Sequence, residues 1–166
     1  RPPPYAATRA AFAYAFPADR LVLALKYGGA LAHADFLAGA LASAAAVGDA
    51  EVVVPMPLSS RRQRARGFNQ ANEIAGRVAR RLGLPAAAAL VRVRDAPAQA
   101  GSRRRERLAN PRGAFVALPA VAGRRIAIVD DVMTTGATMA AAAHAALAAG
   151  AGRVEAWVVA RTLPPS

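Results

Sequence analysis

The stretch that decides the fold is IAIVDDVMTTGAT, residues 126–138. Four apolar residues of a buried strand lead into the acidic pair Asp130 and Asp131, and a Thr- and Gly-rich turn then opens a helix. Backbone N–H groups and hydroxyls at a helix start form an anion cradle, and Gly136 lets an anion approach closely. Two carboxylates beside this cradle repel a bare phosphate but accept hydroxyl hydrogen bonds. The pattern therefore indicates a phosphorylated sugar, and the alternative is an ordinary capped helix after a strand that ends in two acids.

Apolar runs before and after this stretch predict the rest of the sheet. We expect strands at Glu51–Val54, Leu90–Val93, Ala114–Leu118, Arg125–Val129 and Val154–Val159. Helical periodicity predicts helices at Leu31–Val47, Phe68–Leu82 and Ala137–Ala149, whereas Leu21–Tyr27 fits a helix or a strand. Strands that are apolar on both faces and alternate with helices predict an α/β fold with a mostly parallel five-stranded sheet flanked by helices.

Composition limits the classes of protein that this chain can be. Its 166 residues fit one domain, and 55% hydrophobic residues suffice for a buried core. With no cysteine and two histidines, a disulfide scaffold and a cysteine or multi-histidine metal centre are excluded. We expect no membrane span, a cytoplasmic location and no metal held by side chains alone. The net charge of +12 fits a surface for phosphates, or a genome with strong GC bias.

Residues 126–138 resemble the phosphoribosyl-pyrophosphate (PRPP) motif of type I phosphoribosyltransferases. Three further segments resemble the ComF family of cytoplasmic proteins linked to competence and DNA uptake: LALKYGG (23–29), VVVPMPLSSRRQRARGFNQAN (52–72) and QAGSRRRERLANPRGAF (99–115). The family's N-terminal cysteine zinc module has no counterpart in these residues. The resemblance implies one type I phosphoribosyltransferase-like domain over 1–166, with a small hood and N-terminal helix in 1–50, a core in 51–166 and a flexible loop in 95–112.

The resemblance also implies a role for each segment of the site. Asp130 and Asp131 would bind the ribose 2′- and 3′-hydroxyls. The 5′-phosphate would be held by Thr134, Thr135, Gly136, Ala137 and Thr138. The pyrophosphate loop would comprise Leu58, Ser59, Ser60, Arg61, Arg62, Arg64 and Arg66. The flexible loop would close over PRPP with Gln99, Arg103, Arg104, Arg105, Arg107 and Asn110. Lys26 and Tyr27 would contribute to the hood over the acceptor.

Structural alternatives exist for these segments. Each arginine-rich loop also reads as a solvated basic turn or an inert linker, and Lys26 as an ordinary solvated lysine. His33 and His144 read as surface or packing residues rather than ligands.

The function implied is transfer of a phosphoribosyl group from PRPP, with Mg²⁺, to an unknown acceptor base or amine. The alternative is a non-catalytic PRPP sensor or a component of natural transformation that binds single-stranded DNA weakly through its arginines. A competence helicase or a recombination protein would be a partner, and a homodimer is the expected assembly. A general polyanion-binding module does not explain the acidic pair, because carboxylates repel a nucleic-acid backbone.

Overall fold

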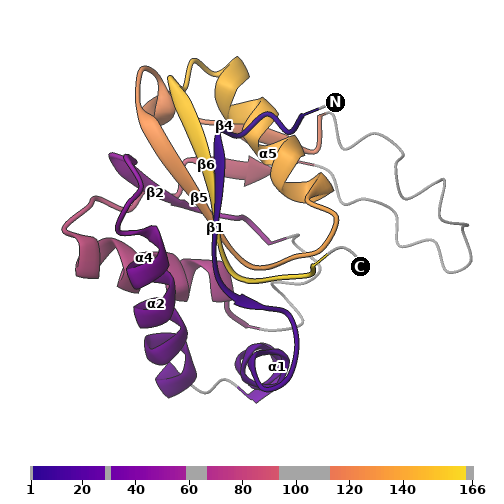
Figure 1. The fold of residues 1–166 in the computed structure, drawn as a ribbon. Helices are drawn as coiled ribbons and strands as arrows, with labels where there is room; N and C mark the ends of the chain where they lie inside the picture. The colour runs from indigo at the N-terminus through magenta and orange to yellow at the C-terminus, as the bar shows by residue number, and fades with distance from the viewer. Residues whose placement is uncertain (1, 29–30, 59–66, 94–112, 164–166) are drawn as a thin grey trace, which may run out of the picture.

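Four parallel strands form the main sheet, in the order β1-β6-β5-β2 (Figure 1). The computed structural model describes residues 2–28, 31–58, 67–93 and 113–163. The strands of this sheet are β1 (Ala7–Ala13), β2 (Val52–Pro55), β5 (Arg125–Met133) and β6 (Arg153–Arg161). In the register, Ile128 of β5 pairs with Val54 of β2 on one side and with Ala156 of β6 on the other. Because the strands run in one direction, their carboxyl ends meet at one edge of the sheet.

Helices cover both faces of this sheet, since its inner strands bury side chains on each side. The helices are α1 (Ala18–Gly28), α2 (Leu31–Ala45), α4 (Gln70–Leu82), α5 (Ala137–Ala148) and the short 3₁₀ helix η2 (Pro119–Val121). Apolar residues of α1, α2 and α4 pack with Ala127 and Trp157 on one face. Apolar residues of α5 pack with Ile128 and Val158 on the other face. The sheet therefore lies between two separate apolar clusters, as the α/β class requires.

Local sequence explains where the amphipathic helix α4 begins and ends. The Asn69 side chain accepts the backbone N–H of Ala71 at 3.0 Å, which caps the first turn. Gly83 ends the helix in the left-handed conformation, with φ of 67°. The expected end at Leu82 before a glycine is thus confirmed, whereas the helix begins at Gln70 instead of the expected Phe68. None of the helices in the described ranges combines the length and the hydropathy that a membrane span needs.

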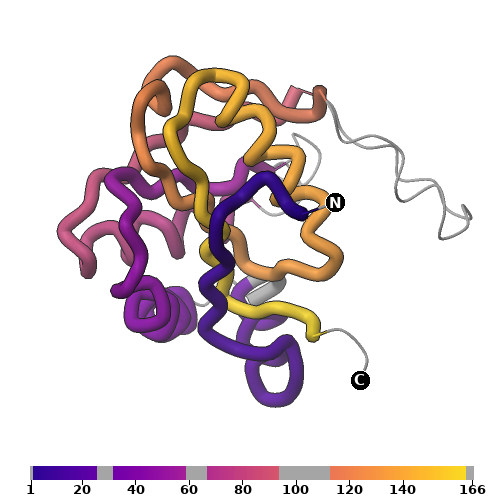
Figure 2. The backbone as a smooth tube through the Cα atoms, turned by 45° about the horizontal axis from the view of Figure 1, so that its top comes forward, coloured from indigo at the N-terminus to yellow at the C-terminus, as the bar shows by residue number. Residues whose placement is uncertain are grey.

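The predicted strand set was wrong in two places. Leu90–Arg92 (β3) and Phe115–Ala117 (β4) form a separate antiparallel pair instead of two central strands of the main sheet. Each has three residues, of which only the first is buried, so neither carries the two apolar faces of a central strand. The strand that was missed is β1, an Ala-rich segment that pairs only with β6 among the described strands (Figure 2). Its residues are half-buried, which weakens the apolar signal.

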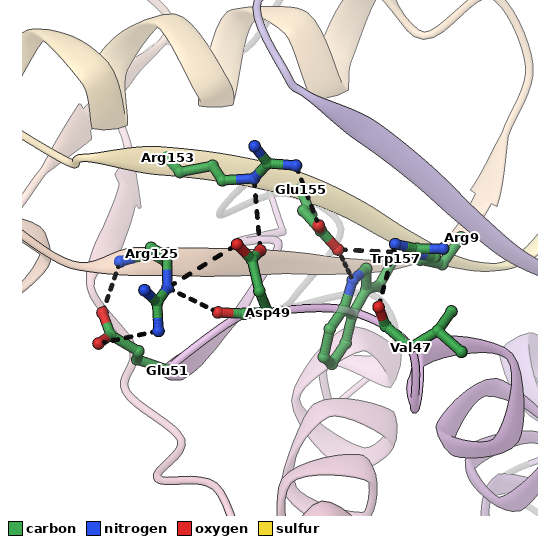
Figure 3. Close-up of polar contacts among 8 residues, drawn as sticks. All are labelled: Arg9, Val47, Asp49, Glu51, Arg125, Arg153, Glu155 and Trp157. Carbon is green, nitrogen blue, oxygen red and sulfur yellow. Dashed lines mark hydrogen bonds and ion pairs between the residues drawn. The ribbon is translucent and has the colours of Figure 1, made fainter.

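The amino-terminal end of the sheet is occupied by ion pairs (Figure 3). The buried Glu155 accepts the indole N–H of Trp157 at 2.9 Å and lies 3.6 Å from Arg9 Nε. Asp49 lies 3.3 Å from Arg153 Nε, and Glu51 forms an analogous pair with Arg125 at 3.3 Å. These charges neutralise one another, so this end of the sheet has a structural role.

Candidate functional site

A pocket of about 670 Å³ lies at the carboxyl ends of β2 and β5. These two strands are neighbours, but the helices that follow them, α4 and α5, cover opposite faces of the sheet. The segments that follow β2 and β5 therefore leave the sheet toward opposite faces. A crevice remains between them, as at the switch point of other open α/β sheets. Leu58 and the segments 56–57 and 69–71 form one wall, and residues 130–139 form the other. Tyr14 and Arg92 complete the lining.

Both residues of the acidic pair line this pocket. The pairing of β2 with β5 ends at Val129, but β5 continues to Met133, so the acids lie in the part of the strand that extends beyond its neighbour. This corrects the expectation that the strand ends before the acids. Asp130 Oδ1 accepts the N–H of Asp131 at 2.9 Å, and Asp131 Oδ1 accepts the N–H of Val132 at 2.7 Å. Backbone donors therefore hold both half-buried carboxylates at the pocket surface.

The loop after the acidic pair forms the next part of this wall. All of Thr134, Thr135, Gly136, Ala137 and Thr138 line the pocket, and their binding of a 5′-phosphate stays a prediction. Gly136 has a φ of 75° and is the N-cap of α5, and the first-turn residues Ala137, Thr138 and Met139 also line the pocket. The Thr135 hydroxyl lies 3.4 Å from the Ala137 nitrogen and accepts its hydrogen bond. A Cβ atom at Gly136 would lie 2.9 Å from the Tyr5 hydroxyl, so glycine is needed for space as well as for its conformation.

A second helix, α4, begins in the other wall of the pocket. Asn69 Nδ2 donates to the backbone carbonyl of Met56 at 3.1 Å, which ties the start of α4 to the end of β2. Gln70, the first residue of α4, lines the pocket and is 1% exposed. The pocket therefore lies between the amino-terminal ends of two helices, each of which carries partial positive charge.

The predicted site residues fall into two groups. The pocket brings together Asp130, Asp131, Thr134–Thr138 and Leu58. Most of the two predicted loops lies outside the described residues, namely Ser59, Ser60, Arg61, Arg62, Arg64, Arg66, Gln99, Arg103, Arg104, Arg105, Arg107 and Asn110. Lys26 and Tyr27 belong to α1, which settles the choice between helix and strand there, but their side chains are outside the described part.

Sequence reasoning missed several residues that line the pocket: Tyr14, Met56, Asn69, Gln70 and Arg92. Asn69 carried a usable signal, because asparagine before an apolar-periodic segment favours a helix cap at the end of a strand–helix turn. No sequence signal pointed to Arg92 as a pocket residue, since its position depends on how the β3–β4 pair packs. Its guanidinium lies 5.4 Å from the ring centre of Phe115, which orients it.

The side chains present suit a magnesium ion only in company with a ligand. Among the described residues, no group of three His, Cys, Asp or Glu side chains is arranged to hold a metal. Two carboxylates in one pocket do fit Mg²⁺, which commonly binds one or two carboxylates together with phosphate oxygens and water. Asp130 and Asp131 are therefore the residues that would hold it, jointly with a phosphorylated ligand.

Comparison with known proteins places this geometry in context. The family model described as the phosphoribosyl transferase domain matches residues 69–163, more than half of the chain. The chain is 39% identical over 112 residues to DNA utilization protein YhgH of Salmonella typhi, a match that covers 67% of this chain and 49% of that protein. It is 34% identical over 115 residues to Competence protein F of Haemophilus influenzae, covering 67% of this chain and 50% of that one. The matched stretch thus spans about half the length of these relatives.

A solved structure supports the fold. The chain resembles the glutamine PRPP amidotransferase from B. subtilis complexed with ADP and GMP, with a TM-score of 0.54 and 24% identity. The likeness covers 75% of this chain and 25% of the amidotransferase. At this identity it bears on the fold alone, which is the α/β fold of type I phosphoribosyltransferases.

Proposed function

Because the chain belongs to the phosphoribosyl transferase domain family, in its ComF branch, we propose that its carboxyl-end pocket binds PRPP and that the protein transfers the phosphoribosyl group to a base or an amine. One observation carries this proposal: the carboxylates of Asp130 and Asp131 line a pocket between the amino-terminal ends of two helices. A ligand that fits must present hydroxyls to the acids and anionic groups to the helix ends.

The chemistry of PRPP matches this arrangement from one end to the other. Its 5′-phosphate suits the loop Thr134–Thr138, where backbone N–H groups and hydroxyls are available. Its 2′- and 3′-hydroxyls suit the carboxylates of Asp130 and Asp131, which lie next to that loop. Its diphosphate, at the other end of the ribose, suits the wall formed by Leu58 and the start of α4. The pocket volume of about 670 Å³ is in the range of small-molecule sites.

In the proposed reaction, the bond from ribose C1 to the diphosphate oxygen breaks and a bond from C1 to the acceptor nitrogen forms. The acceptor nitrogen loses a proton, and diphosphate leaves with its bonding electrons. Asp130 and Asp131 would orient the ribose through its hydroxyls, and the helix ends would favour negative charge on the phosphate groups. Bound Mg²⁺ would neutralise charge on the departing diphosphate.

The biological setting of the proposed activity is competence and DNA uptake. The names of two relatives, Competence protein F and DNA utilization protein, support this setting. A second candidate function keeps the PRPP pocket as a sensor and uses the arginine clusters at 61–66 and 103–107 for single-stranded DNA; the charge of +12 favours it. Release of pyrophosphate from PRPP, screened across bases and amines with Mg²⁺, separates the two functions, because only the enzyme turns PRPP over.

The acidic pair offers a direct test of PRPP binding. Asp130→Asn combined with Asp131→Asn keeps the Oδ1 atoms that accept backbone N–H groups, so the fold should be retained. Weaker bonds to two ribose hydroxyls should cost about 2–4 kcal/mol, which is roughly 30- to 1,000-fold in affinity. The measurement is titration calorimetry with PRPP and Mg²⁺ beside a thermal melt.

A matched control separates this effect from the change in net charge. Asp35→Asn combined with Asp49→Asn also removes two negative charges, from exposed ion pairs outside the pocket. Such pairs contribute about 0–1 kcal/mol each, so this variant should fold and bind PRPP like the parent. If the Asp130 and Asp131 double variant melts normally and still binds PRPP like the parent, the ribose role of the pair is refuted.

A further inference from the structure

Gln70 has a buried amide without a partner in the wall of the pocket. The residue is 1% exposed and lines the pocket at the first position of α4. Within the ranges that the structure describes, Gln70 Nε2 is one of three buried side-chain atoms that lack a hydrogen bond, and the other two belong to Arg9 and His33, which do not line the pocket. Burying an amide donor without an acceptor lowers stability, so such a group needs an explanation.

The neighbours of Gln70 do not supply that acceptor. The adjacent Asn69 has both ends of its own amide engaged, since it donates to Met56 and accepts from Ala71. The side chains packed around the start of α4 include Ala71 and Met56, which are apolar. A bound ligand can supply the acceptor, because Gln70 is part of the surface that encloses it.

The position of Gln70 decides which part of the ligand it meets. It lies at the start of α4, the helix that follows β2, whereas the loop Thr134–Thr138 follows β5, and both segments line the pocket. If that loop holds the 5′-phosphate and the acids hold the ribose hydroxyls, the group left for the α4 wall is the diphosphate on C1. The partial positive charge at the start of α4 favours the same group.

We propose that Gln70 is a binding residue for the diphosphate of PRPP and that its side-chain amide donates a hydrogen bond to a diphosphate oxygen. This inference rests on the proposed function and deepens it. It also accounts for an amide rather than a charged side chain at this position. A buried neutral donor is less costly than a buried cation while the pocket is empty, and it still completes the shell of donors around the anion.

The test compares Gln70→Met with the parent protein. Methionine has a similar length but no donor, so the free protein should melt at the parent temperature or slightly above, since an unpartnered amide is removed. Affinity for PRPP and for pyrophosphate, each with Mg²⁺, should fall about 10-fold or more, because a hydrogen bond to a charged oxygen is lost. Affinity for ribose 5-phosphate should stay within about twofold of the parent value. Asn72→Met, at an exposed amide on the same helix, should leave all three affinities unchanged.

Each outcome of these titrations has a defined meaning. If the parent protein binds none of the three ligands, the proposed function is refuted and the inference falls with it. If the parent binds all three and Gln70→Met binds PRPP and pyrophosphate equally well, only the role of Gln70 is refuted. An equal loss for ribose 5-phosphate would overturn the assignment to the diphosphate, and a much lower melting temperature would show a structural amide. Gln70→Glu, which keeps the size but replaces the amide donor with a carboxylate that repels the diphosphate, should likewise weaken pyrophosphate binding and serves if the methionine variant does not fold.

Discussion

Replacing Gly136 by alanine should destabilise the protein and weaken binding of a 5′-phosphate. Gly136 has a φ of 75°, and a Cβ atom there would lie 2.9 Å from the Tyr5 hydroxyl. The left-handed conformation costs alanine about 1–2 kcal/mol, offset by about 0.4–1 kcal/mol from the stiffer unfolded chain. Because the atom met is the outer end of a half-buried tyrosine, the ring can turn aside at a cost of about 0.5–1.5 kcal/mol. Together these contributions give a total loss of about 0.5–3 kcal/mol, with a central value near ~2 kcal/mol.

Gly123 provides the matched control for the conformational part of this loss. Its φ is 71°, and nothing lies within 4 Å of the position that a Cβ atom would take. Gly123→Ala should therefore lose only about 1 kcal/mol, which is about 2–4 °C in melting temperature for a chain of this size. Gly136→Ala should lose about 3–10 °C. Its affinity for ribose 5-phosphate should also fall, whereas Gly123 precedes β5 at the other end of the sheet and should have no effect on binding.

The assay is a thermal melt of both variants, alone and in a Tyr5→Phe background, with ribose 5-phosphate titrated into each. Phenylalanine removes the hydroxyl that the new Cβ atom would meet, so Gly136→Ala should then lose no more than Gly123→Ala. Equal melting temperatures and equal affinities for the two single variants would refute the close contact at Gly136. A loss at Gly136 that persists fully in the Tyr5→Phe background would show that the hydroxyl is not its cause.

Two further predictions concern other parts of the chain. Glu155→Ala should lower the free energy of unfolding by about 1–3 kcal/mol, because it leaves the buried indole N–H of Trp157 without an acceptor. Glu155→Gln, which still accepts that bond, should lose less than half as much, and equal losses in urea unfolding would contradict this role. The arginines at 61–66 and 103–107 should bind single-stranded DNA weakly, without sequence preference, and with an affinity that falls steeply between low and moderate salt. A binding constant that does not change with salt would rule out this mode of DNA binding.

Local sequence was sufficient to predict much of the candidate site. The motif at residues 126–138 joins a buried strand, two acids and a helix start without interruption, so its elements are neighbours along the chain. Covalent connection alone brings Asp130, Asp131 and the loop Thr134–Thr138 to one wall of the pocket. The stop at Gly83 was equally local, because it depends on hydrogen bonds within one helix turn.

Sequence alone therefore determined the α/β class, the end of α4 at Leu82 and one wall of the pocket, because these depend on periodicity and on contacts between near neighbours. Only the tertiary structure decided which strands share the main sheet, since β1 and the β3–β4 pair are assigned by partners far away in the chain. Only the tertiary structure placed Tyr14, Gln70 and Arg92 around the acidic pair. The physical reason is that residues from five separate segments meet there through packing on two faces of one sheet, and no local pattern encodes that meeting.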